Sequence, residues 1–351
     1  MIRGATEWSG LRLIPFKTRM ATRMTMRVTM RAVELTPQGV VLREDYPLPV
    51  ERPGEVRIRV TRAGVCDTDL QLIRGYMRFQ GVLGHEFVGV AESGPWSGRR
   101  VVGEINCSCH ACATCRSGLP NHCPHRTVLG ILGRDGAFAE YVVLPQRNLH
   151  LVPDHVSDDQ AVFVEPLAAA FQIPSQVLLT PRMRVLVLGD GRLGQLCARV
   201  LALSRCRLTV IGKHPAKLAL LRDCGIDAAL RGEIVPDHSA DVVVDATGSA
   251  SGVEDACGWL KPRGTLVLKT TIAGRPPLSL AAVVVDELHV IGSRCGPFPP
   301  AIAALADGTI DVEPLIQARY PLAQALQALE RANSQPVLKV LLEGANGPSQ
   351  R

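Results

Sequence analysis

The stretch Val185-Leu186-Val187-Leu188-Gly189-Asp190-Gly191-Arg192-Leu193-Gly194 decides the fold of this chain. Its first four residues have the unbroken apolar character of a strand that is buried on both faces. The glycines that follow form the pattern Gly-x-Gly-x-x-Gly, and a helical run with Leu196, Val200 and Leu201 on one side comes next. A strand, a glycine-rich turn and a helix in that order predict a dinucleotide-binding α/β unit.

Each glycine of this motif has its own physical role. Gly189 permits the tight turn, Gly191 lets the backbone approach a pyrophosphate, and Gly194 lets helix and strand pack closely. The helix N-terminus, which includes Arg192 and Leu193, offers free N–H groups and the positive end of its dipole to the phosphates. We therefore expect these five residues to bind a dinucleotide. The alternative is a glycine-rich turn with a structural role only.

The tip of the second strand, at residues 208–211, bears on which dinucleotide is bound. An acidic residue there normally accepts a hydrogen bond from the ribose 2′-hydroxyl of NAD, but residues 191–222 contain no Asp or Glu. Gly212 stands at the expected acid position, and Lys213 and Lys217 follow it. A carboxylate would repel a 2′-phosphate and lysine attracts one, so the sequence favours NADP(H) over NAD(H). The alternative is that both lysines lie on the solvated face of the next helix.

The chain changes character at about residue 156, and its length of 351 residues suits two domains. Residues 30–155 are short alternating strands broken by Gly and Pro, which is typical of a β-rich domain. In residues 156–298 apolar strands alternate with helix-like stretches, which indicates a Rossmann doubly wound parallel sheet. The fold class is therefore α/β, and residues 299–351 are expected to return to the β-rich domain. Arg-rich residues 1–29 predict a flexible extension, with an organellar targeting peptide as the alternative.

The composition is that of an ordinary globular protein. Apolar residues make up 46% and charged residues 21% of the chain, and no apolar run approaches the roughly 20 residues of a membrane span. Of the net charge of +6, residues 1–29 contribute +5, so the rest is almost neutral. The chain has only 3 Trp, 4 Tyr and 7 Phe to stack on bases. We expect no nucleic-acid partner, no membrane association and, without a secretory apolar stretch, a cytoplasmic location.

Four of the eleven cysteines have the spacing of a structural zinc site. The run Cys109-x2-Cys112-x2-Cys115-x7-Cys123 supplies four thiolates that a compact loop can wrap into a tetrahedron. An odd number of cysteines without a secretory signal argues against a disulfide framework. A redox thiol pair is the alternative interpretation, and Cys107 and His110 are spare donors that could shift the ligand set. A site closed by four thiolates holds a loop together and performs no reaction.

Three further fragments carry side chains suited to a catalytic metal. They are residues 64–69 (GVCDTD) with Cys66, residues 84–89 (GHEFVG) with His85 and Glu86, and residues 164–170 (VEPLAAA) with Glu165. A thiolate, an imidazole and a carboxylate are suitable zinc ligands, and a catalytic zinc needs three protein ligands and one open position. Taken singly, each has a structural alternative, namely a buried thiol, a core histidine or an acid favoured at a helix start.

Taken together and in this order, these motifs resemble the zinc-dependent medium-chain dehydrogenase/reductase family, the alcohol and polyol dehydrogenases. The resemblance covers nearly all of residues 30–345 and implies a GroES-like catalytic domain beside the Rossmann domain. It implies that Cys66, His85 and Glu165 hold a catalytic zinc, and that Glu86 can exchange with Glu165 or with water. Asp69 would orient His85, the support that metal-bound imidazoles need.

The resemblance also implies the reaction. Zinc polarises the oxygen of an alcohol and lowers its pKa, and hydride passes between the substrate carbon and the nicotinamide. Thr68 is the candidate to pass the alcohol proton outward, because its hydroxyl both donates and accepts. Well-known alcohol dehydrogenases continue this relay to a histidine, and the matching position here is Gln71. Glu165, in place of the cysteine of many simple alcohol dehydrogenases, is more similar to the polyol and sugar dehydrogenase branch.

Several alternatives stay open at this point. One is an NAD-dependent sugar, polyol or amino-alcohol dehydrogenase, another is a non-catalytic sensor that retains nucleotide and zinc, and a third is a zinc-ribbon nucleic-acid binder. We expect a homo-oligomer, a dimer or tetramer, because related enzymes commonly assemble through the Rossmann domain, and a strand predicted at residues 284–288 could serve the seam. Arg294 could meet an anionic substrate or the cofactor, or could simply anchor the linker.

Overall fold

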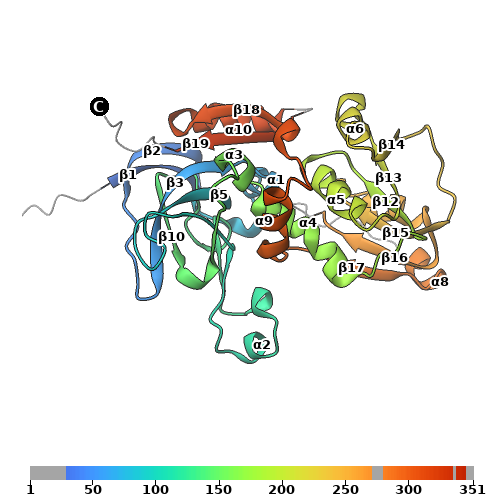
Figure 1. Ribbon diagram of the computed structural model, residues 1–351, viewed down its shortest axis with the longest axis horizontal. Helices are drawn as coiled ribbons and strands as arrows, with labels where there is room; N and C mark the ends of the chain where they lie inside the picture. The colour runs from blue at the N-terminus through green and yellow to red at the C-terminus, as the bar shows by residue number, and fades with distance from the viewer. Residues whose placement is uncertain (1–28, 271–279, 335–336, 345–351) are drawn as a thin grey trace, which may run out of the picture.

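The computed structural model of the protein describes residues 29–270, 280–334 and 337–344. The expected N-terminal extension lies outside these residues except for Thr29, which begins the first strand. A β-rich body and a body built on a parallel sheet lie side by side along the longest axis, with the helix α4 (Val164–Gln176) between them (Figure 1). Among the described residues, no helix is long and apolar enough to cross a membrane.

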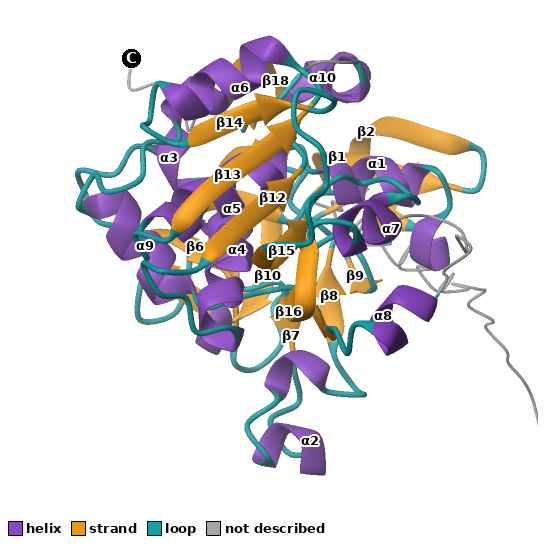
Figure 2. Ribbon diagram, turned by 90° about the vertical axis from the view of Figure 1, so that its right-hand side faces the viewer, coloured by secondary structure: helices purple, strands orange, loops and turns teal. Residues whose placement is uncertain are grey.

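A six-stranded parallel sheet is the centre of the second body (Figure 2). Its strand order is β14-β13-β12-β15-β16-β17, so the chain starts in the middle and winds outward in both directions. This is the doubly wound order of a Rossmann fold, and it confirms the predicted fold class. The strands are β12 (Arg184–Leu188), β13 (Arg207–Gly212), β14 (Asp227–Leu230), β15 (Ala240–Asp245), β16 (Leu260–Leu268) and β17 (His289–Gly292).

Side-chain alternation along β12 explains why both faces of this sheet are covered. Val185 and Val187 belong to one apolar cluster, whereas Leu186 and Leu188 belong to another on the opposite face, because successive side chains of a strand point to opposite sides. All four side chains are buried. The first face is covered by α4, α5 (Arg192–Ala202), α6 (Pro215–Arg222) and α9 (Phe298–Ala306), and the second by α7 (Gly252–Cys257) and α8 (Ala281–Val285).

The β-rich body contains a seven-stranded sheet in the order β11-β6-β5-β3-β19-β18, with β10 paired to β3. Two three-stranded sheets, β2-β1-β4 and β7-β8-β9, complete it. The strands are β1 (Thr29–Thr36), β2 (Gly39–Pro47), β3 (Glu55–Gly64), β4 (Gly81–Val82), β5 (Glu86–Ala91), β6 (Arg100–Gly103), β7 (Asn106–Cys107), β8 (Thr127–Leu129), β9 (Gly133–Arg134), β10 (Tyr141–Pro145), β11 (Leu149–Leu151), β18 (Ile316–Pro321) and β19 (Lys339–Glu343).

The C-terminal segment returns to this body through β19, which runs antiparallel to β3 with Leu341 opposite Gly64. It therefore completes the sheet whose strands carry the predicted metal-ligand fragments. The helices of this part are α1 (Asp67–Ile73), α2 (Ala113–Arg116), α3 (Asp158–Ala161) and α10 (Ala325–Asn333), with 3-10 turns at Tyr76–Arg78, Pro120–His122, Gln146–Asn148, Glu313–Leu315 and Leu322–Gln324.

For the Rossmann sheet, one strand expected from the sequence is wrong and one observed strand was not predicted. The predicted strand at residues 284–288 is the end of the helix α8 followed by a turn in which Glu287 has a φ of 49°. A short apolar run does not show by its periodicity whether it is strand or helix, which explains this error. The edge strand β14 was not predicted, because its residues Asp-Ala-Ala-Leu lack the β-branched and aromatic side chains typical of strands.

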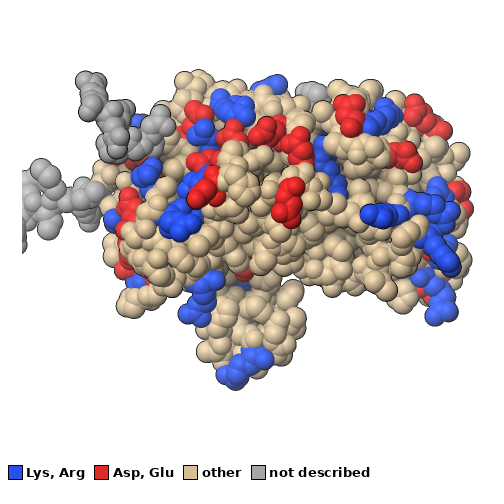
Figure 3. All heavy atoms as spheres, viewed as in Figure 1, with Lys and Arg blue, Asp and Glu red and all other residues tan. Residues whose placement is uncertain are grey.

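Charges on the surface follow no single-sign stripe on the face shown in Figure 3. Along the upper part of that face Lys and Arg side chains lie close to Asp and Glu, and much of its centre carries neither. This distribution agrees with a folded body whose charge is nearly balanced once residues 1–29 are set aside.

Candidate active site

Asp69 links the two loops that carry the first metal-ligand candidates. Its carboxylate accepts a hydrogen bond from the backbone N–H of Cys66 at 2.9 Å, which caps α1, and another from Gly84 at 3.2 Å. Asp69 Oδ1 also lies 3.2 Å from His85 Nδ1, which is within ion-pair distance although the angles of a hydrogen bond are not met. Because Asp69 is completely buried, these contacts hold Cys66 and His85 in one fixed arrangement. The Nδ1 edge of the imidazole faces the carboxylate, so Nε2 is the edge left for a metal.

Cys66, His85 and Glu86 converge to a donor set of one thiol, one imidazole and one carboxylate. Their ligand atoms all lie within 4.8 Å of one another. Glu86 Oε1 is buried and has no hydrogen-bond partner among the described residues, which is the state of an oxygen whose partner is a bound cation. The residues present therefore fit a zinc ion.

The other oxygen of Glu86 is engaged by a cation of the chain itself. Lys339 Nζ, at the start of β19, lies 2.5 Å from Glu86 Oε2, and the two side chains are 3% and 1% exposed. Sequence reasoning missed Lys339, because no motif surrounds it and only the return of the C-terminal segment brings it to Glu86.

Glu165 does not join the converging group of three. It lies in the first turn of α4, where burial raises its pKa to about 7. The charge of His85 lowers this pKa and the charge of Glu86 raises it, so Glu165 lies within electrostatic reach of the group. A cation would remove the cost of burying its charge. The role of Glu165 as third ligand stays a prediction.

The proposed proton path begins on α1, next to Cys66. Thr68 is half-buried in the first turn of this helix, and Gln71, one turn further, donates a hydrogen bond to Asp67 at 3.3 Å. The side chain at the position of the relay histidine therefore faces Asp67 at the helix surface.

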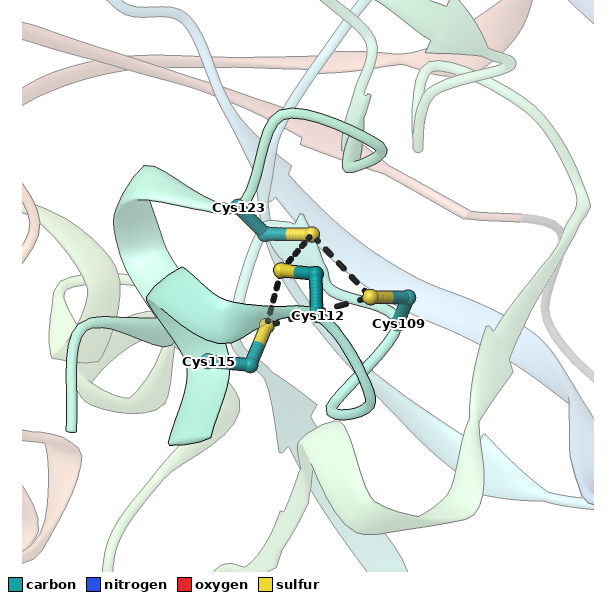
Figure 4. A group of neighbouring side chains, drawn as sticks. All are labelled: Cys109, Cys112, Cys115 and Cys123. Carbon is teal, nitrogen blue, oxygen red and sulfur yellow. Dashed lines mark hydrogen bonds between the residues drawn. The ribbon is translucent and has the colours of Figure 1, made fainter. Parts of the chain in front are cut away.

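The four cysteines of the predicted structural zinc site lie at the corners of a tetrahedron (Figure 4). The sulfur–sulfur distances are 3.9 Å for Cys109–Cys115, 3.5 Å for Cys112–Cys115, 3.8 Å for Cys112–Cys123 and 3.5 Å for Cys109–Cys123. Four sulfurs at about 2.3 Å from one zinc would be about 3.8 Å apart, so the tetrad fits this metal. Cys107 is buried elsewhere with its sulfur near Ile105 O, and neither Cys107 nor His110 belongs to the cluster.

The glycines of the nucleotide motif differ in what surrounds them. Gly189 has a φ of 112°, and a Cβ there would lie 2.5 Å from Ala246 O. A Cβ on Gly194 would lie 2.1 Å from Gly189 O, which is the close packing of helix and strand that the motif predicts. A Cβ on Gly191 would have no described atom within 4 Å, so no described neighbour requires this residue to be small.

A cavity of about 630 Å³ opens beside these glycines at the carboxyl ends of the parallel strands. Gly212, Lys213 and Lys217 line it as expected, together with residues 189–191. Leu193 packs against the apolar core instead. The Arg192 guanidinium donates to Leu338 O at 2.6 Å and to Ala332 O, so this side chain joins the glycine loop to the C-terminal segment.

Three residues of the cavity wall, Asp190, His214 and Arg231, were not singled out from the sequence. Asp190 and His214 stand beside predicted residues, but only the structure shows that they contact each other.

Arg294, for which two roles were open, donates to Asn121 O and thereby contacts the lobe of the four cysteines.

Two protein-family models match the chain. Residues 52–154 match the alcohol dehydrogenase GroES-like domain, and residues 193–307 match the zinc-binding dehydrogenase domain. Among curated proteins, the chain is 28% identical to a sorbitol dehydrogenase of Halalkalibacterium halodurans over 85% of this chain and 94% of that protein. It is 29% identical to a D-arabitol-phosphate dehydrogenase of Enterococcus avium over 85% and 92%, respectively.

Solved structures of similar proteins contain either dinucleotide. A zinc-binding dehydrogenase structure from Sinorhizobium meliloti, bound to NADP, superposes with a TM-score of 0.80 and 25% identity over 90% of this chain and 99% of that one. The alcohol dehydrogenase RspB from Escherichia coli CFT073, in complex with NADH, gives a TM-score of 0.81 and 27% identity over the same shares.

Proposed function

This chain belongs to the zinc-dependent medium-chain dehydrogenase/reductase family, and from that premise we propose which reaction its own residues support. The protein is an oxidoreductase of the zinc-binding alcohol dehydrogenase type. We propose that it transfers hydride between a polyol, or another primary or secondary alcohol, and NADP(H). The observation that carries this proposal is the convergence of Cys66, His85 and Glu86 within 4.8 Å.

We propose two zinc ions in each chain, one in the four-cysteine lobe and one at the converging group. Bound there, the second zinc supplies a Lewis acid toward an alcohol oxygen, and the dinucleotide supplies the hydride acceptor. Cys66 and His85 hold the metal in an orientation set by Asp69. Glu165 is the third ligand in this proposal, as the family resemblance implies, and Glu86 Oε1, unpartnered within the described part of the chain, can exchange with it or with water.

The proton of the alcohol leaves through the hydroxyl of Thr68, which lies two residues after the ligand Cys66 and is half-buried. Gln71 carries no titratable group, so water at the surface of α1 receives the proton from Thr68 Oγ1.

The polyol class is supported by the names of the similar proteins, among them sorbitol dehydrogenase and an erythritol/L-threitol dehydrogenase.

NADP(H) is supported by the basic wall of the cavity. Lys213, Lys217 and Arg231 line it, and Lys217 is 4% exposed without a hydrogen-bond partner for its ammonium group among the residues that the structure describes. An anionic ligand bound in the cavity would give this ammonium group a charge-assisted hydrogen bond.

Assembly through the Rossmann domain is part of the proposal. β17 is the edge strand of the parallel sheet, and Val290 on it is 43% exposed. On the neighbouring α8, Val284 and Val285 are 73% and 79% exposed. An open sheet edge flanked by exposed valines is a surface that a second copy would cover. Val290→Asp should dissociate the oligomer in size-exclusion chromatography, whereas Val235→Asp, at an exposed valine in the segment that follows β14, should leave it intact.

The experiment that tests the reaction is a panel of polyols and secondary alcohols with NADP or NAD, using protein purified without chelator. We expect reduction of NADP to be faster than reduction of NAD with at least one polyol. Cys66→Ala should abolish turnover, whereas Cys107→Ala, at a buried thiol outside both zinc groups, should retain it. Turnover by Cys66→Ala equal to that of the wild type would rule out the proposed zinc site.

A further inference from the structure

A carboxylate does stand at the tip of the second strand, although the sequence places no acid there. Asp190 reaches it from the glycine loop after β12. Its Oδ2 accepts hydrogen bonds from the backbone N–H groups of Lys213 at 2.8 Å and His214 at 2.7 Å. The carboxylate thus ties the first turn of the nucleotide motif to the turn after β13.

The Asp190 carboxylate occupies the space that a side chain at position 212 would need. A Cβ on Gly212 would lie 2.4 Å from Asp190 Oδ2 and 2.6 Å from Asp190 Cβ. The absence of a side chain at the expected acid position therefore makes room for Asp190, in addition to removing a negative charge from the strand tip.

The same carboxylate orients an imidazole toward the cavity. His214 Nδ1 lies 2.9 Å from Asp190 Oδ1, and the His214 side chain is 33% exposed at the cavity wall. A carboxylate at Nδ1 fixes the ring and favours the tautomer with a proton there. Nε2, at the opposite edge of the ring, contacts no described residue through a hydrogen bond. A donor or acceptor of the ligand is therefore free to bind it.

The carboxylate oxygens of Asp190 are largely occupied by hydrogen bonds within the protein. Its two oxygens receive three hydrogen bonds, and its side chain is only 6% exposed. Burial alone would raise the pKa of Asp190, but these hydrogen bonds lower it below its usual value. A carboxylate in this state is a poor acceptor for a ribose hydroxyl, because few of its lone pairs remain open.

Positively charged residues line the same cavity as the His214 ring. Three of them are Lys213, Lys217 and Arg231, and the carboxylate of Asp255, which also lines the cavity, is already paired with Arg231 at 3.0 Å. An anion bound in this cavity therefore has two lysines available that form no ion pair with a carboxylate among the described residues.

We propose that Asp190 and His214 form a dyad that recognises the 2′-phosphate of the dinucleotide. Asp190 is the positioning residue, and His214 acts as the imidazolium, with Nδ1–H directed at Asp190 and Nε2–H donating to a phosphate oxygen, while Lys217 and Lys213 supply charge. This inference rests on the proposed use of NADP(H). It assigns the selection of NADP(H) over NAD(H) to Asp190 and His214 as well as to the two lysines.

The test compares two small ligands that differ in the phosphate at the 2′ position. Isothermal titration calorimetry on the full zinc-loaded chain measures the Kd of 2′,5′-ADP and of 5′-AMP. We expect the wild type to prefer 2′,5′-ADP. His214→Ala should weaken 2′,5′-ADP by about tenfold or more, the size of a charge-assisted hydrogen bond, and change 5′-AMP by less than about twofold. His214→Arg should restore the preference, and His125→Ala, at an exposed imidazole of the four-cysteine lobe, should not affect it.

The positioning role of Asp190 has its own readout. Asp190→Asn should lower the preference for 2′,5′-ADP in the wild type but not in the His214→Ala background, because Asp190 acts through the ring. If Asp190→Asn raises the preference in both backgrounds, Asp190 acts as a repelling charge and the dyad is refuted. If the wild type prefers 2′,5′-ADP and His214→Ala keeps that preference, the dyad is wrong while NADP(H) use stands. If the wild type binds both ligands equally, both proposals fail.

Discussion

Lys339 Nζ lies 2.5 Å from Glu86 Oε2, although the two residues are 253 positions apart in the chain. Lys339 begins β19 and Glu86 begins β5 directly after His85. The ammonium group also lies 5.3 Å from the centre of the Phe163 ring, just before α4. The negative charge of Glu86 is thus balanced by Lys339, which lies on the strand that the C-terminal segment adds to the sheet.

Removal of this buried ammonium should destabilise the fold. We expect Lys339→Met to lower the free energy of unfolding by about 3 to 5 kcal/mol, because Glu86 would keep a buried charge without its partner. Urea denaturation monitored by circular dichroism measures the change. The matched control is Lys261→Met, which breaks the half-exposed pair with Asp241 and should cost less than about 1 kcal/mol. Equal losses in the two variants would contradict this account.

Two glycines of the nucleotide motif should respond to alanine in opposite ways. Gly194→Ala should lower the free energy of unfolding by about 1 to 3 kcal/mol, because its Cβ would meet Gly189 O at 2.1 Å. Gly191→Ala has open space around its Cβ, so it should fold normally and weaken NADPH binding. Thermal unfolding and fluorescence titration with NADPH separate the two effects. Wild-type NADPH affinity in Gly191→Ala would show that the pyrophosphate does not approach this residue.

The number of zinc ions bound per chain should depend on the cysteines of the four-cysteine cluster and not on the nearby thiol of Cys107. We expect about two zinc ions per wild-type chain by elemental analysis, about one in Cys123→Ala, and about two in Cys107→Ala. The reason is that the Cys123 sulfur lies 3.5 and 3.8 Å from two other cysteine sulfurs, whereas Cys107 is buried near Ile105 O. Loss of one zinc from Cys107→Ala would mean that the ligand set is shifted.

Acid should weaken the ion pairs that Asp159 of α3 makes with β3 and β18. Burial by itself would raise the pKa of Asp159, but hydrogen bonds from Arg62 at 2.8 Å and Arg319 at 2.7 Å lower it overall. A carboxylate with a lowered pKa in the folded state stabilises the fold above its unfolded-state pKa of about 4, and this contribution is lost as the pH falls through the folded-state value.

The wild type should therefore be more stable than Asp159→Asn near neutral pH, by about 1 to 2 kcal/mol. The difference should shrink as the pH falls below about 4. Urea denaturation across this pH range measures it. Asp45→Asn, which removes the exposed partner of Arg43, is the control and should show little difference at any pH. A gap that persists unchanged at low pH would mean that Asp159 acts through packing and not through its charge.

Much of the fold could be predicted because local sequence and fold agree. The alternation that places Val185 and Val187 on one face and Leu186 and Leu188 on the other needs only a strand buried on both sides. The spacing of Cys109, Cys112, Cys115 and Cys123 within one loop confines their sulfurs to a small volume, and the structure gives them zinc-like distances. Family membership and the class of enzyme, expected from the order of the motifs, are confirmed.

The electrostatic partners of the site could not be predicted in the same way. Lys339 meets Glu86 only because β19 pairs with β3, and Asp190 reaches the strand tip only because the turns after β12 and β13 are adjacent. Glu165, expected as a ligand from the resemblance, lies outside the converging group. Each of these contacts joins segments that the linear pattern treats as unrelated.

The sequence by itself determined the elements whose signals are local, namely the parallel strands other than β14, the glycine turn and the four-cysteine loop. The pairing of distant charges was decided only by the tertiary structure, which buries Glu86 against Lys339 and Asp190 against His214. The physical reason is that hydrophobic periodicity and turn chemistry act over a few residues. A buried charge must find its partner in space, wherever the chain supplies one.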